Sequence, residues 1–200
     1  MTKLRLTKIE AAHRQIDAAI RMTFANEDPV AIHSVATAGQ RIIRDVCESR
    51  GDVESYLQFT DWIAPGHEKE FWSAMNKSSN FIKHADNDPH RTHDFNIEAS
   101  DFVILLAIHW YRGLGRPLTI EMHVFTVWWM ILHPKYIKPQ ALTMFEQAGM
   151  NMKVLLKSEP SLLSRDDRLK IGMAELNRAK ESPPNFVKRN LLPTSVLLAA

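Results

Sequence analysis

The feature that most constrains this chain is the placement of its prolines, which divide it into segments of helical length. The chain has 200 residues with 10 prolines, and these fall between stretches whose apolar residues recur every three or four positions. That spacing is typical of amphipathic α-helices, and no stretch shows the strict alternation of a half-buried strand. The sequence therefore predicts an all-α protein, a helical bundle of about seven to eight helices.

The first two predicted helices form an antiparallel helical hairpin. The first covers residues 4–26, with Ile16 and Ile20 on its apolar face. Asp28 and Pro29 are the residue types of an N-cap and a first helical position, so a second helix is expected to begin there. Further helices are predicted at about residues 52–63, 67–86, 97–111, 118–132, 140–156 and 162–180.

Length and composition favour a cytoplasmic protein of one all-α domain over residues 1–200. The predicted C-terminal helices fall within 117–181, and a tail follows at 182–200. The net charge of +2 gives no electrostatic argument for nucleic acid or membrane binding. Cys47 is the single cysteine, which excludes an internal disulfide and fits a reducing compartment.

No membrane contact is expected either, because the longest apolar runs, at 102–110 and 124–132, are shorter than the roughly 20 residues of a spanning helix. The sequence identifies no cofactor.

A histidine-rich segment at residues 80–94 carries the side chains best suited to chemistry near neutral pH. His84, His90, His93 and Asp94 have the donor atoms that zinc, manganese or iron prefer, although their spacing matches no structural zinc pattern. The His93-Asp94 pair is similar to the doublet of the HD-type metal phosphohydrolases. That likeness implies a metal-dependent hydrolase as an alternative function, and further ligands would come from His67 and from Asp166 or Asp167.

The helix before this segment carries a polar row. Asn76, Asn80 and His84 recur at i, i+4 and i+8, beside Lys77 and near aromatic residues. Amides and an imidazole in such a row could read a base or orient a phosphate, and they could equally bond to neighbouring backbone groups.

The hairpin followed by the segment Ser-Asn-Phe-Ile-Lys-His at 79–84 resembles the HEPN group of small helical bundles, over residues 4–112. In that group an arginine, a polar residue and a histidine form the signature, and arginine and histidine serve metal-independent attack by the RNA 2′-hydroxyl. Asn80 matches the polar residue and His84 the histidine. Ser79 stands at the arginine position, and Lys77 offers a cation at another spacing.

The resemblance implies His84, Asn80 and Lys77 as candidate catalytic residues, RNA or a nucleotide as partner, and a homodimer. Because the arginine is missing, it favours a dimeric binding protein over an active ribonuclease. The chain is also similar to uncharacterised bacterial proteins with an Asn-Phe-x-Lys-His-Ala segment, a likeness that implies no activity.

Other notable residues have structural interpretations. His13, in a Glu-x-x-His step with Glu10, is expected at the core or its boundary, and Cys47 is expected as a half-buried structural thiol. The aromatic cluster is interpreted as core, with an apolar ligand pocket or the interface of a structural partner protein as alternatives. It comprises Trp110, Tyr111, Phe125, Trp128 and Trp129.

Overall fold

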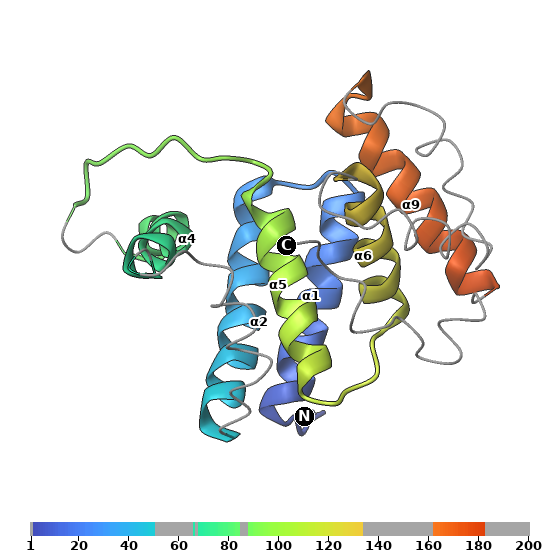
Figure 1. Ribbon diagram of the computed structural model, residues 1–200, viewed down its shortest axis with the longest axis horizontal. Helices are drawn as coiled ribbons and strands as arrows, with labels where there is room; N and C mark the ends of the chain where they lie inside the picture. The colour runs from blue at the N-terminus through green and yellow to red at the C-terminus, as the bar shows by residue number, and fades with distance from the viewer. Residues whose placement is uncertain (1, 51–65, 67, 85–87, 134–161, 183–200) are drawn as a thin grey trace. The chain divides into compact units, whose positions relative to one another are not determined.

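The computed structural model describes residues 2–50, 66, 68–84, 88–133 and 162–182 (Figure 1). These residues form six α-helices and no β-strand, so the all-α prediction is confirmed for them. The helices predicted at 52–63 and 140–156 lie outside the described residues, as does the tail beyond residue 182. The helices are α1 (Lys8–Phe24), α2 (Pro29–Arg50), α4 (Glu68–Lys83), α5 (Ala99–Gly113), α6 (Ile120–Leu132) and α9 (Arg165–Glu181).

The chain divides into two compact units. The first unit consists of residues 1–19 and 28–116, and the second of residues 20–27 and 117–200. Helix α1 therefore contributes its first part to one unit and its last turn to the other. None of the helices described is long and apolar enough to cross a membrane.

Helix α1 begins later than predicted because Thr7 and Glu10 form a capping box. The N and Oγ1 of Thr7 donate to Glu10 Oε2 at 2.7 and 2.8 Å, and Glu10 N donates to Thr7 Oγ1 at 3.2 Å. The hydrogen bonds from the backbone and hydroxyl of Thr7 hold the pKa of the Glu10 carboxyl below its ordinary value. The carboxylate of Glu10, in the Glu-x-x-His step with His13, therefore caps the N-terminus of α1.

Helix α2 begins as the sequence predicts. Asp28 Oδ1 accepts hydrogen bonds from Val30 N and Ala31 N, both at 2.9 Å, and Pro29 is the first helical residue. Further along α2, a β-carbon on Gly39 would lie 2.9 Å from Ile16 Cδ1 and 3.1 Å from the carbonyl oxygen of Ala12. Glycine at this position therefore permits the close approach of α1 and α2.

The core of the first unit lies where α2 packs on α5. Cys47 is buried, whereas the sequence predicts a half-buried thiol. It packs against α5, with its Sγ 3.9 Å from the carbonyl oxygen of Trp110. Trp110 is fully buried, with its ring 6.1 Å from that of Trp72 on α4. His13 sits at the core boundary with its ring edge-on to Tyr111 at 6.2 Å, as predicted for a boundary histidine.

The core of the second unit is aromatic. The ring of Phe24 lies 5.9 Å from Phe125 and 5.3 Å from Trp128, and the indole Nε1 of Trp128 donates to the carbonyl oxygen of Arg168 at 2.8 Å. Gly172 on α9 faces Phe24 so closely that a β-carbon there would lie 2.3 Å from the ring. Helix α9 therefore fits closely against the end of α1 at Gly172, and it is bonded to α6 through Trp128.

All five residues of the predicted aromatic cluster are buried, each within its own unit. Burial supports the core interpretation, because a ligand pocket or partner interface needs side chains that a second molecule can reach. We assign the cluster to the core and place no partner surface on it.

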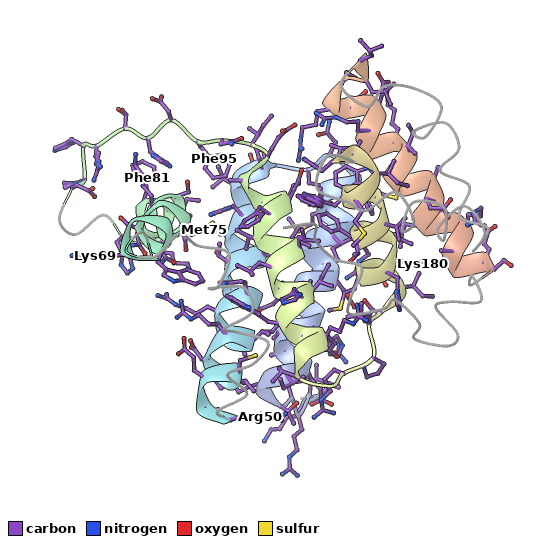
Figure 2. All side chains as sticks on the ribbon, in the orientation of Figure 1. Arg50, Lys69, Met75, Phe81, Phe95 and Lys180 are labelled. Atoms are coloured by element: carbon purple, nitrogen blue, oxygen red, sulfur yellow. The ribbon has the colours of Figure 1, made fainter. Side chains whose placement is uncertain are left out.

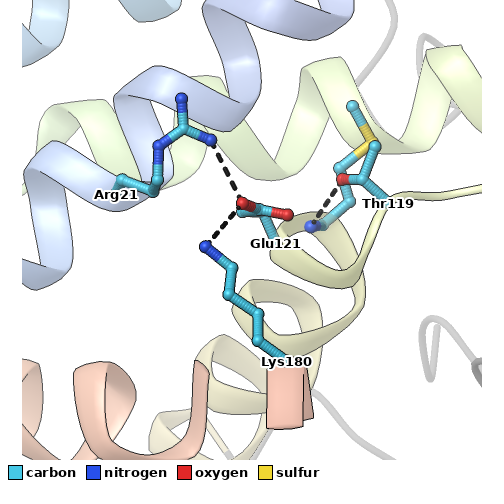
Figure 3. A network of polar contacts seen from close by, with 5 residues as sticks. Arg21, Thr119, Glu121 and Lys180 are labelled. Atoms are coloured by element: carbon cyan, nitrogen blue, oxygen red, sulfur yellow. Dashed lines mark hydrogen bonds and ion pairs between the residues drawn. The ribbon is translucent and has the colours of Figure 1, made fainter. Parts of the chain in front are cut away.

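A carboxylate ties three helical segments of the second unit together (Figure 3). Glu121 Oε1 accepts from Arg21 at 3.1 Å and from Lys180 at 2.9 Å. Burial alone would raise the pKa of Glu121, but hydrogen bonds from Lys180 and Arg21 outweigh it, and the pKa lies below its ordinary value. The two cations in this network are therefore matched by one ionised acid.

Candidate functional site

The outer face of α4 carries the residues that the sequence proposes for catalysis. Lys77, Asn80, Phe81 and His84 are spaced i, i+3, i+4 and i+7, which places them on one face of a helix. All four are exposed, and Phe81 keeps 37% of its surface accessible. His84 N donates to the carbonyl oxygen of Asn80 at 3.1 Å, so this stripe of four residues continues past the last residue of α4. We call it the outer stripe.

One histidine of the following segment folds back against α4. His93 Nε2 and Ser78 Oγ share a hydrogen bond of 2.8 Å, and the imidazole of His93 lies 5.2 Å from the ring of Phe81. The structure therefore brings His93 to the outer stripe. His90 and Asp94 are exposed.

The metal ligands that the sequence proposes are not gathered in the part of the chain that the structure describes. Among those residues, no group of three or more His, Cys, Asp or Glu side chains could hold a metal ion. His67 lies outside the described residues. Asp166 contacts Lys170 and Asn26, and Asp167 N donates the cap hydrogen bond to Ser164 Oγ at 3.1 Å. The metal site stays a prediction.

The opposite side of α4 faces α2 and encloses a small polar cavity. Its volume is about 10 Å³, roughly that of a site for one water molecule. Figure 2 shows Met75, one of the lining residues, on the side of α4 toward α2. The lining comprises Thr37, Gln40 and Arg41 from α2, Trp72, Met75, Asn76, Ser79 and Lys83 from α4, and Val103 from α5. We call this contact the polar seam.

The polar seam divides the row of Asn76, Asn80 and His84. Asn76 lines the cavity and its Nδ2 donates to the carbonyl oxygen of Trp72 at 2.8 Å, whereas Asn80 and His84 are exposed on the outer stripe. Ser79, at the arginine position of the HEPN-like segment, is only 6% exposed and lines the cavity. The motif position that would carry the guanidinium thus faces α2 and not the exposed histidine.

A buried histidine, His33, lies on α2, one of the two helices that form the polar seam. His33 is 1% exposed, its Nδ1 lies 3.2 Å from Ser100 Oγ, and its ring is edge-on to Phe95 at 5.3 Å. Burial, with smaller contributions from the positive charges of Lys83 and His93, lowers the pKa of His33 from 6.5 to about 4. His33 is therefore neutral at pH 7.

Two cations line the polar seam, and none of the lining residues that the structure describes is an acid. Arg41 and Lys83 both line the cavity, and both are exposed to solvent. Burial of its amine lowers the pKa of Lys83, and the charge of Arg41 lowers it further. The sequence indicates that one side of α2 is polar, because His33, Thr37 and Arg41 recur at i, i+4 and i+8. This spacing does not indicate which helix packs against that side.

Comparisons with protein-family models, with curated proteins and with solved structures give no significant match for this chain. The chain's own residues therefore carry the argument about function.

Proposed function

We propose that this chain binds single-stranded RNA through the outer stripe of α4, and that it binds without cutting. The observation that carries the proposal is an exposed aromatic ring, Phe81, on one helical face with a lysine, an amide and a histidine. Proteins that bind single strands combine cations, which contact the phosphate backbone, with aromatic rings on which bases stack. The outer stripe offers both, and the imidazole of His93 extends its aromatic surface.

Binding is favoured over cleavage because of where Ser79 lies. The HEPN-like chemistry needs a guanidinium beside the histidine, but the corresponding position is a buried serine directed toward α2. Lys77 and His84 remain exposed on the outer stripe, where they serve as contacts to phosphate or base. The low net charge of +2 leaves stacking, and not long-range attraction, as the main source of affinity.

The resemblance also supports finer proposals about the whole chain. We propose a cytoplasmic homodimer whose complete fold has about seven to eight helices, with α1 and α2 as an antiparallel hairpin. The cap at Asp28 and the close contact at Gly39 support the hairpin. Light scattering on the purified chain measures the mass, and a monomer at all concentrations would reject the dimer.

Fluorescence anisotropy with a labelled single-stranded RNA tests the main proposal. We expect Phe81→Ala to weaken binding by roughly 5- to 100-fold, the range for loss of one stacked base. Lys77→Ala should also weaken binding, and less so as salt rises. Lys69→Ala is the matched control, because Lys69 is an exposed lysine on the same helix outside the stripe (Figure 2).

The same samples decide between binding and cleavage. RNA recovered after incubation with the wild-type chain should remain intact, and His84→Ala should change affinity only. The proposal fails if the wild-type chain does not bind, or if Phe81→Ala binds as well as Lys69→Ala. Cleavage that His84→Ala abolishes would restore the ribonuclease hypothesis.

A further inference from the structure

The polar seam has a positive charge that its described residues do not balance. Among the nine lining residues that the structure describes, Arg41 and Lys83 are cations and none is an aspartate or glutamate. Within the described part of the chain, neither cation forms an ion pair with a carboxylate. Two like charges at one contact repel each other, and an anion between them would remove that repulsion.

Hydrogen-bond donors also point to a missing partner. The hydroxyl of Thr37 donates to the carbonyl oxygen of His33 at 2.8 Å, and the amide of Asn76 donates within α4, so both are occupied. The hydroxyl of Ser79 and the amide of Gln40 line the cavity, and neither side chain bonds to any other residue that the structure describes. Ser79 is only 6% exposed and lines the cavity, so its hydroxyl is available to a ligand that enters the seam.

The size of the cavity limits what can enter. About 10 Å³ accommodates roughly one water molecule or one oxygen atom of a ligand. Arg41 and Lys83 are exposed and border the opening, so the rest of the ligand stays at the mouth. A tetrahedral oxyanion fits this arrangement, with one oxygen near Ser79 and the others toward the guanidinium and the amine.

We propose that the polar seam between α2 and α4 is a binding site for a phosphate group, held by Arg41, Lys83 and the Ser79 hydroxyl. A dianionic phosphate matches the two cations in charge, and a guanidinium with an ammonium is a common pair of phosphate ligands. The site lies on the side of α4 away from the outer stripe. It therefore goes beyond the proposed RNA binding and does not depend on it.

Nuclear magnetic resonance of the full-length, ¹⁵N-labelled chain tests the site with inorganic phosphate as the probe at constant ionic strength. We expect saturable shifts of the backbone amides of Gln40, Arg41 and Ser79, beyond those caused by chloride. Arg41→Gln and Lys83→Gln should each weaken binding at least tenfold, and Arg41→Lys should restore part of it. Lys69→Gln, an equal loss of charge at an exposed position of α4 outside both the outer stripe and the cavity lining, should leave binding within about twofold of wild type.

Two further probes distinguish the sources of such a phosphate. Adenosine monophosphate presents a monoester and the dinucleotide ApA presents a diester, so their affinities relative to inorganic phosphate show which form the seam accepts. The proposal is overturned if phosphate causes no saturable shifts, or if Arg41→Gln and Lys83→Gln bind it as well as Lys69→Gln. Phosphate binding that persists when Phe81→Ala abolishes RNA binding supports this site separately from the outer stripe.

Discussion

The contact of α9 with α6 and the contact of α4 with α2 differ in what fills them. Between α6 and α9, Trp128 is buried and its indole N–H is bonded, and beside it Gly172 of α9 fits closely against Phe24 at the end of α1. The two cations nearby, Arg21 and Lys180, share one carboxylate. Between α2 and α4, polar side chains surround a cavity, and two cations face it with no acid among the lining residues that the structure describes.

The α6–α9 contact stabilises the fold by itself, whereas the α2–α4 contact has charges and a donor that are available to a ligand. Buried apolar surface and matched charges stabilise a helix pair without help from a ligand. An interface with unmatched charge and an unfilled donor is less stable by itself, and it gains free energy when a complementary ion binds. Three predictions test this contrast, in order of decreasing effect.

The largest effect is expected from truncating the centre of the α6–α9 contact. Trp128→Ala should lower the free energy of unfolding by about 3–5 kcal/mol, because it removes a fully buried indole and its hydrogen bond to the carbonyl oxygen of Arg168. Urea unfolding followed by circular dichroism measures it. Trp72→Ala in the polar seam should cost clearly less, because Trp72 is only partly buried.

Equal losses in these two variants would show that the two contacts do not differ in stability. Trp128→Phe is the conservative control, since it keeps most of the buried ring while removing the hydrogen bond, at an expected cost of about 1 kcal/mol for the bond itself.

The second prediction concerns the pH dependence near the polar seam. Because the pKa of His33 is 6.5 when unfolded and about 4 when folded, the unfolded chain takes up this proton first as pH falls. The contribution of neutral His33 is complete above pH 6.5 and is lost between pH 6.5 and 4. The loss amounts to about 3 kcal/mol in the free energy of unfolding.

Urea unfolding at pH 7 and pH 4.5 checks most of this loss, about 2.5 kcal/mol between these two pH values. His33→Gln should remove that part of the slope, whereas Ser100→Ala, which deletes the hydrogen-bond partner and no titrating group, should retain it. Lys83→Gln should make the slope shallower, because the charge of Lys83 contributes to lowering the pKa of His33. Identical slopes in wild type and His33→Gln would contradict the prediction.

The smallest effect comes from exchanging single charges in the two regions. Glu121→Gln should lower the free energy of unfolding by about 1 kcal/mol, because it leaves Arg21 and Lys180 without their shared acid. Arg41→Gln should change it by no more than about 0.5 kcal/mol, because Arg41 is exposed and faces a like charge.

Thermal or urea unfolding at low salt measures both variants. If Arg41→Gln destabilises the chain as much as Glu121→Gln does, Arg41 has a structural role, and the contrast between the two contacts is lost.

The sequence predicts the helices well because their signals are local. Apolar periodicity locates each described helix, and Asp28 caps α2 as expected. The start of α1 is wrong by a few residues because the Thr7–Glu10 capping box went unrecognised. Cys47 is more buried than predicted because its depth depends on α5, which lies far away in sequence.

The candidate site is only partly predictable for the same reason. Residues at i, i+4 and i+8 drift by about 40° per step around a helix, so Asn76 and His84 can lie on different faces. The orientation of α4 decides which of these residues face α2 and which are exposed, and that orientation depends on the contacts of α4 with α2. Arg41 and Lys83 are distant in sequence, and only the packing of α4 on α2 brings them to one cavity.

Gly172 has a consequence for how α9 can move along the end of α1. Because Gly172 has no side chain, the surface of α9 has space for the ring of Phe24 at this position. Sliding α9 by one turn, about 5.4 Å, would bring Arg168 or Leu176 to the ring in place of Gly172. Both have side chains that the space cannot hold, so α9 has one permitted axial position on this contact and its register is fixed.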